Sequence, residues 1–149
     1  MQSLVKSKAQ GIRPYSMDLS RRECIELLER IRWGGEPQCP YCGSRRASPM
    51  DKGLRHHCND CFTSYSVTVG TIFHKTHVDL QKWFRTIELV AQQPQYITVR
   101  ALANIIEVSK DTAGSMLNRI KTMKREDPKF FKEICLALEK RNKKDDKSY

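Results

Sequence analysis

The sequence lacks any long run of apolar residues. Hydrophobic residues make up 39% of the chain and charged residues 30%, and no stretch approaches the roughly 20 apolar residues that a membrane-spanning helix needs. The lysines of the first eleven residues, MQSLVKSKAQG, are not followed by an apolar segment, so no secretory signal is predicted. We therefore expect a soluble, cytoplasmic protein without a membrane partner. In that reducing compartment, paired cysteines bind metal more often than they form disulfides.

Acidic residues are in deficit. The 149 residues include 27 Lys and Arg but 17 Asp and Glu, which gives a formal net charge of +10. The excess lies in the middle, because residues 38–78 carry five basic and two acidic side chains, and residues 79–125 carry eight and four. This distribution suits a polyanionic partner, to which phosphate attraction supplies affinity that does not depend on sequence. P-loop, dinucleotide-binding and metalloprotease motifs are absent, so no small-molecule substrate is expected.

Five segments have the capping residues or the apolar spacing of helices. The first spans about residues 20–32 and opens with Ser20 and Glu23, the spacing of a capping box. The second has the clearest apolar stripe, and Pro94 lies just beyond its end. We expect the five helices to begin after Ser20, Asp79, Thr98, Ser109 and Asp127.

Two other segments and two isolated cysteines complete the outline. Residues 62–69, FTSYSVTV, alternate apolar and polar side chains, which predicts a half-buried strand. Residues 139–149, EKRNKKDDKSY, mix both charges without apolar anchors and are expected to fray or to be disordered. Cys24 and Cys135 lie on or beside the apolar faces of their helices, so we interpret them as packing residues.

The remaining four cysteines form two Cys-x-x-Cys pairs separated by fifteen residues. Zinc prefers four soft or borderline ligands in a tetrahedron, and each Cys-x-x-Cys turn brings two sulfurs together. A site with four thiolates has no open position for a substrate, so we predict one structural zinc ion. Two redox motifs or disulfides are the alternative. The predicted metal ligands are Cys39, Cys42, Cys58 and Cys61.

Four histidines offer further nitrogen ligands. His56 and His57 precede the second cysteine pair and could replace a thiolate, although four cysteines already complete the shell. His74 and His77 could form a second metal site, but two histidines without other ligands nearby are more often surface residues.

The segment VRALANIIEVSKDTAGSMLNRIKTMKR predicts two short helices joined by a tight turn, the spacing of a helix-turn-helix. Its second helix would present a polar face opposite its apolar one, with an asparagine able to meet an adenine edge and cations able to hold phosphates. A plain helical hairpin with a solvated polar face is the alternative. The predicted DNA-binding residues are Lys110, Ser115, Asn118, Lys121, Thr122 and Arg125.

Several motifs occur together and in order over residues 17–125: IRW, CPYCGS, a second Cys-x-x-Cys, SVTVGTIFHKTH, QKWF and VSKDTAGSMLNRIKTM. In this respect the sequence resembles the N-terminal half of zinc-ribbon insertion-sequence transposases. The resemblance implies zinc on the four cysteines and DNA binding by the segment around Ser109–Lys124. In that family a separate C-terminal DDE nuclease of the ribonuclease-H type cuts and joins DNA.

The sequence departs from the family pattern in three ways. Glu107 stands at the turn position where the family usually has Gly, and Gly114 stands where a bulky aromatic residue is common. The chain also ends where the nuclease would begin, and Asp145 and Asp146 in a charged tail cannot supply its metal-binding geometry. We therefore expect no enzymatic activity.

These observations predict an α+β protein with an N-terminal helix, a small β zinc ribbon and an all-helical helix-turn-helix unit. We expect a flexible N-terminus at 1–16, the first helix and ribbon at 17–78, the helix-turn-helix unit at 79–125, and a C-terminal helix with a charged tail at 126–149.

The predicted function is binding of double-stranded DNA, either as a transposase remnant or as a regulator recruited from one. The alternative is an adaptor whose ribbon docks on a nucleic-acid machine such as RNA polymerase, with a separate transposase or transcription-machinery subunit as partner. A third hypothesis is an enzyme completed by a nuclease on a second chain. Salt-dependent binding to naked duplex would separate a DNA-binding protein from an adaptor.

Overall fold

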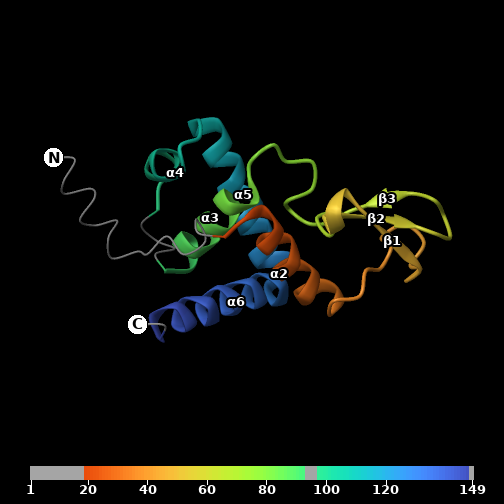
Figure 1. Cartoon of the computed structure of the whole chain (residues 1–149). Helices are drawn as coiled ribbons and strands as arrows, with labels where there is room; N and C mark the ends of the chain where they lie inside the picture. Colours follow the sequence, from red (N-terminus) through yellow and green to blue (C-terminus); the bar gives the residue numbers. More distant parts are fainter. Residues whose placement is uncertain (1–18, 93–96, 148–149) are drawn as a thin grey trace.

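The computed structural model describes residues 19–92 and 97–147, as a helical body with a small sheet on one side (Figure 1). The 1–16 segment and Pro94 lie outside the described residues. The arrangement confirms the predicted α+β class. The helices are α2 (Arg21–Trp33), α3 (Leu80–Gln92), α4 (Val99–Ile106), α5 (Lys110–Glu126) and α6 (Pro128–Lys147); the strands are β1 (Ala47–Met50), β2 (Arg55–Cys58) and β3 (Ser64–Tyr65).

Helix α2 begins with the predicted capping box. The Glu23 amide donates to Ser20 Oγ at 3.1 Å, and the Ser20 amide donates to Glu23 Oε1 at 3.0 Å. Gly34 ends the helix in the left-handed conformation, with φ of 67°. Cys24 is buried on the inner face, and burial raises the pKa of its thiol to about 12. Cys24 is therefore a protonated packing residue, as its position in the sequence predicts.

The sheet is antiparallel with the strand order β1-β2-β3, and a short 3₁₀ turn at Asp51–Gly53 joins its first two strands. The predicted strand at 62–69 is mostly wrong, since only Ser64 and Tyr65 pair with β2. Beyond Tyr65, the Arg32 guanidinium of α2 donates to the carbonyl oxygens of Val67 and Val69, at 2.6 and 2.9 Å. These carbonyl groups are therefore satisfied by a side chain rather than by a neighbouring strand.

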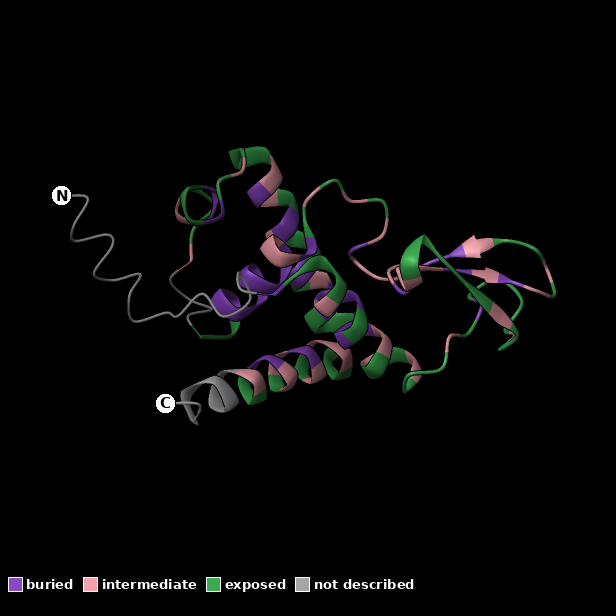
Figure 2. Cartoon of the chain, in the orientation of Figure 1, coloured by how far each residue is buried: buried purple, intermediate pink, exposed green. Residues whose placement is uncertain are grey.

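Helix α3 is the centre of the helical body, and it packs against α2, α4, α5 and α6. Its predicted apolar stripe is buried except for Ala91, and Figure 2 shows buried residues gathered where the helices face one another. The loop before it is attached through Phe73, whose ring lies 5.5 Å from that of Trp83 and 6.0 Å from that of Phe84. No helix within 19–92 and 97–147 is long and apolar enough to cross a membrane.

The predicted helix-turn-helix forms from α4 and α5. Thr98 Oγ1 accepts from the Ala101 amide at 3.0 Å, and Ser109 Oγ accepts from the Thr112 amide at 3.1 Å, so both predicted N-caps are confirmed. Glu107, in the turn between the helices, adopts the left-handed conformation with φ of 59° and ψ of 58°. The turn thus keeps a conformation that suits Gly although a glutamate occupies it.

Helix α6 extends the fold beyond what the sequence predicts. Residues 139–147 are helical as far as Lys147, so the expectation that this segment frays is wrong for them. Ile134 and Leu138 are buried against the body, and Arg141 Nη1 lies 3.3 Å from Glu23 Oε2 on α2. The segment contains no Gly or Pro to end the helix, and the long-range ion pair holds it against the first turn of α2.

The Glu107 turn generates a stability prediction. Replacing Glu107 by Gly should raise the free energy of unfolding by about 0.5–1 kcal/mol, because Gly adopts positive φ without the Cβ clash. Urea unfolding in the presence of zinc measures the change. Glu107→Ala keeps the Cβ and is the control, for which no gain is expected. A Gly variant no more stable than the Ala variant would contradict strain at this turn.

Candidate metal centre and nucleic-acid interface

Each cysteine pair lies on a tight loop held by backbone hydrogen bonds. In the first loop the Cys39 amide donates to the Ser44 carbonyl oxygen at 2.8 Å, and the Gly43 amide donates to the Cys39 carbonyl oxygen at 2.9 Å. Gly43 has φ of 79°, a conformation that glycine adopts without strain. The Tyr41 amide also points at Cys39 Sγ, at 3.4 Å. The loop therefore presents its sulfurs from a fixed backbone.

The second loop repeats this design. The Cys58 amide donates to the Thr63 carbonyl oxygen and the Phe62 amide donates to the Cys58 carbonyl oxygen, both at 2.9 Å. Phe62 occupies the place that Gly43 has in the first loop, and it too is left-handed, with φ of 63°. Phe62 is 74% exposed, so no core packing offsets its backbone strain of about 1 kcal/mol or more.

The two loops bring the four predicted ligands together. Sγ of Cys39 lies 3.7 Å from that of Cys61, and Sγ of Cys42 lies 3.5 Å from that of Cys58. All four ligand atoms lie within 4.8 Å of one another. Sulfurs about 2.3 Å from a central zinc ion in a tetrahedron are about 3.8 Å apart. The cluster therefore fits one zinc ion, whose role would be to join the two loops.

Local hydrogen bonds give two of these thiols very different pKa values. The amides of Cys61 and Asp60 lower the pKa of the Cys58 thiol to about 6. At Cys42 the Ser44 amide lowers the pKa, but the neighbouring sulfurs, Cys58 first, outweigh it and raise the value to about 12. Zinc binds thiolates, so metal binding would release protons from such a cluster.

The histidines next to the second pair serve other purposes. His56 is buried, its Nε2 lies 2.8 Å from Glu29 Oε2, and its ring packs against Trp33 and Tyr65 with centroids 5.7 Å away. His56 therefore joins the sheet to α2 rather than replacing a thiolate. His57 packs its ring 6.2 Å from that of Phe62.

A second metal site at His74 and His77 receives no support. Among the described residues, the group of His, Cys, Asp and Glu side chains arranged to hold a metal ion consists of the four cysteines.

The predicted DNA-binding residues share one side of α5. Five of the six are exposed, namely Lys110, Ser115, Asn118, Lys121 and Arg125. Thr122 is half-buried, and its hydroxyl donates to the Asn118 carbonyl oxygen at 3.0 Å. The opposite side of α5 is buried through Ala113, Met116, Ile120 and Met123. Contact of these six side chains with DNA stays a prediction.

Sequence reasoning leaves out Arg119, which is exposed on the flank of α5. Its Nη1 donates to the Ile72 carbonyl oxygen at 3.2 Å, across 47 positions of sequence. The position of Arg119 directly after Asn118 could have marked it as a candidate cation. Its hydrogen bond to Ile72 depends on tertiary structure and could not be predicted from the sequence.

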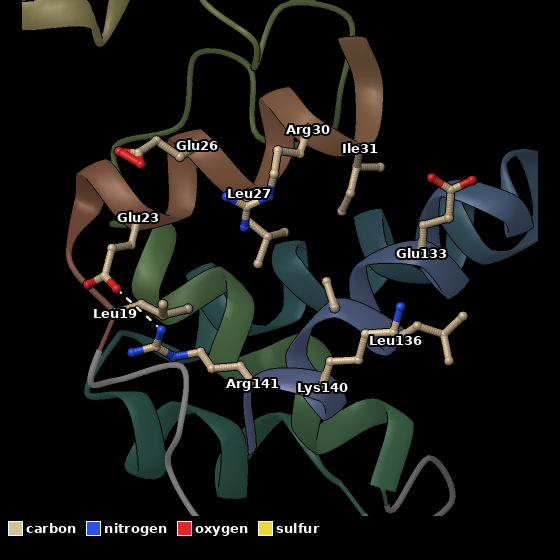
Figure 3. A pocket seen from close by; sticks show the side chains of 11 residues that line it. Leu19, Glu23, Glu26, Leu27, Arg30, Ile31, Glu133, Leu136, Lys140 and Arg141 are labelled. Carbon is tan, nitrogen blue, oxygen red and sulfur yellow. Dashed lines mark hydrogen bonds and ion pairs between the residues drawn. The ribbon is translucent and has the colours of Figure 1, made fainter. Parts of the chain in front are cut away.

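A groove of about 720 Å³ lies between α2 and α6 (Figure 3). The ion pair of Glu23 and Arg141 lies within it, and charges of both signs line it. It contains none of the predicted metal or DNA-binding residues.

The sulfur cluster generates a prediction about metal. Purified without chelators, the chain should carry one zinc ion, and binding of a structural zinc contributes on the order of 10 kcal/mol to folding. Cys58→Ser should therefore unfold the ribbon and lose the metal. Elemental analysis measures zinc content, and hydrogen exchange over residues 47–65 measures ribbon structure.

Two variants control for general destabilisation. Cys135→Ser removes a thiol outside the cluster and should keep one zinc per chain. His56→Ala should also keep zinc. Its free energy of unfolding should fall by about 1–3 kcal/mol, because the Glu29 carboxylate loses its hydrogen-bond partner. Full zinc content and unchanged protection in Cys58→Ser would contradict the assignment.

Comparisons with known proteins agree with the geometry of the ribbon. Residues 19–64 match the family model of the transposase zinc-ribbon domain of the IS1595 type. An uncharacterized protein in the transposable element ISH50 of Halobacterium salinarum is 33% identical over 111 residues, which are 71% of this chain and 36% of that protein. The chain thus spans about a third of the length of this curated relative. No solved structure matches. Residues 19–64 are therefore similar to a transposase zinc-ribbon domain, which agrees with the resemblance seen in the motifs.

Proposed function

We propose that the chain is a zinc-dependent DNA-binding protein that recognises duplex DNA with α5, as a transposase remnant or as a regulator derived from one. The observation that carries the proposal is the polar side of α5, which is left exposed while its opposite side is buried against the body. The transposase-type ribbon and the relative in a transposable element support the same class of function.

The composition of this side suits a major groove. Lys110, Lys121 and Arg125 carry positive charge along α5, where they would contact phosphates. Asn118 is exposed between them, and its carboxamide can pair with the N6 and N7 positions of an adenine. The hydroxyl of Thr122 is already bonded to the helix backbone, so we assign it a smaller part in recognition.

The proposal includes binding without cleavage. The metal-binding arrangement in the described part of the chain consists of thiolate ligands, which complete the shell of a zinc ion and leave no position for a substrate. A nuclease of the DDE type needs instead a cluster of carboxylates around divalent metal ions.

A second candidate function is docking of the ribbon on a protein partner. Tyr41 and Phe62, one from each cysteine loop, are 58% and 74% exposed. Exposed aromatic residues are enriched where proteins bind one another. Binding that is insensitive to salt and to the charges of α5 would favour this function.

The first DNA-binding prediction concerns charge. Lys121→Ala should weaken binding to every duplex and reduce the slope of log affinity against log salt by about one unit. Lys129→Ala removes the same side chain from the first turn of α6, where it is 88% exposed, and should leave the slope unchanged. Fluorescence anisotropy over a salt series, with the zinc-loaded full chain, measures both. Equal slopes in wild type and Lys121→Ala would contradict the phosphate contact.

Asn118→Ala tests specificity in the same assay. It should lose discrimination between a selected and a random duplex, by about 1–3 kcal/mol for a bidentate contact, and keep the salt slope. An equal loss of affinity for the selected and the random duplex would argue against a base contact.

A further prediction concerns cleavage. Incubated alone with Mg²⁺ or Mn²⁺ and end-labelled duplex, the purified chain should yield no cut or joined products. Gel electrophoresis of the labelled DNA is the measurement. Metal-dependent products that copurify with this chain and disappear in a DNA-binding variant such as Lys121→Ala would overturn binding without cleavage.

A further inference from the structure

A groove of about 220 Å³ lies between the loop 75–78 and the first half of α5. Lys75 and His77 line it from the loop and are exposed, while Ser115 and Arg119 line it from α5. Asp111 is the one carboxylate among the residues that line it. The groove is therefore predominantly basic, with hydroxyl and imidazole groups able to donate hydrogen bonds.

The loop wall of this groove is held in place by the helical body. Trp83 Nε1 donates to Thr76 Oγ1 at 3.2 Å, and Phe73, just before the loop, is buried against Trp83. Arg119 Nη1 donates to the Ile72 carbonyl oxygen at 3.2 Å, which ties α5 to the same segment. The loop and α5 are thus positioned relative to each other before any ligand binds.

Lys75 adds a strained backbone to this arrangement. Its φ is 55°, in the left-handed region that a residue with a Cβ adopts at a cost of roughly 1–2 kcal/mol. Its side chain is exposed, so no burial compensates within the loop. Strain of this kind is found at functional sites, and at Lys75 it occurs in the wall of a groove beside α5.

The position of the groove around α5 identifies what it would hold. At 3.6 residues per turn, Arg119 lies about 100° from Asn118 in one direction, while Lys110 and Lys121 lie about 60–80° away in the other. A helix in the major groove has a phosphate backbone on each side of it, because that groove is only about 12 Å wide. The basic groove therefore lies on the flank that faces the second backbone.

We propose that this groove holds one phosphate backbone of the bound duplex, with Lys75 and Arg119 as its charged contacts and His77 and Ser115 as hydrogen-bond donors. The proposal rests on DNA binding by α5, and it assigns the opposite backbone to Lys110 and Lys121. The loop 75–78 then becomes a second DNA-contacting element beside α5, and it fixes the orientation of α5 in the major groove.

Salt-dependent anisotropy with the zinc-loaded full chain gives the first test. Lys75→Ala should weaken binding to every duplex roughly three- to tenfold and flatten the salt slope by about one unit, and Lys75→Arg should restore both. The control is Lys52→Ala, since Lys52 is also an exposed lysine with positive φ, 57°, but lies in the β1–β2 turn. An equal loss in Lys52→Ala would overturn the proposal, because net charge alone would then explain the effect.

Strand-specific neutralisation gives the second test. Methylphosphonate linkages placed in one strand at a time remove phosphate charge from one backbone only. Lys75→Ala and Arg119→Gln should become insensitive to neutralisation on one backbone, and Lys121→Ala to neutralisation on the other. Sensitivity lost on the same backbone in all three variants would overturn the assignment of two flanks.

The outcomes separate this proposal from DNA binding itself. If wild type binds no duplex in a salt-dependent way, the proposed function fails and the groove proposal fails with it. If wild type binds, Lys121→Ala weakens binding and both Lys75→Ala and Arg119→Gln match wild type, only the groove proposal fails.

Discussion

The ribbon has almost no apolar interior apart from its sulfur cluster. Its buried hydrophobic cluster comprises Cys39, Cys58 and Tyr65, so two of these three residues are themselves candidate metal ligands. The sheet around them is short, and β3 contributes only two residues. An interior this small cannot offset the conformational entropy lost on folding. The gathering of four sulfurs around one ion is therefore the constraint on which the shape of this part depends.

Helix α2 connects the ribbon to the helical part of the chain. Its last turns hold the ribbon through Glu29, which meets His56, and through Arg32, which binds the backbone beyond β3. Its first turns meet α6 through Glu23 and Arg141, and its inner face packs on α3. Since α3 also anchors the loop that precedes it and contacts α4 and α5, the ribbon and the helix-turn-helix share one framework.

Features set by neighbouring residues could be predicted from the sequence, and features set by distant ones could not. Ser20, Thr98 and Ser109 cap their helices as predicted because a cap is a contact over three positions. The two cysteine loops could also be predicted, since each is closed by hydrogen bonds within its own backbone. The prediction of a strand at 62–69 is mostly wrong because Arg32, more than thirty positions away, donates hydrogen bonds to the carbonyl oxygens of Val67 and Val69. The helical 139–147 segment and the position of Arg119 likewise depend on long-range contacts.

The contrast between Gly43 and Phe62 shows what a metal-centred interior permits. The two residues occupy equivalent places in the two loops, yet one is relaxed and the other is a strained, exposed aromatic residue. A strain of this size is small beside the free energy that a structural zinc ion contributes. Here the outer surface of the ribbon is largely released from folding requirements, so its side chains can change with the binding partner while the loops keep their geometry.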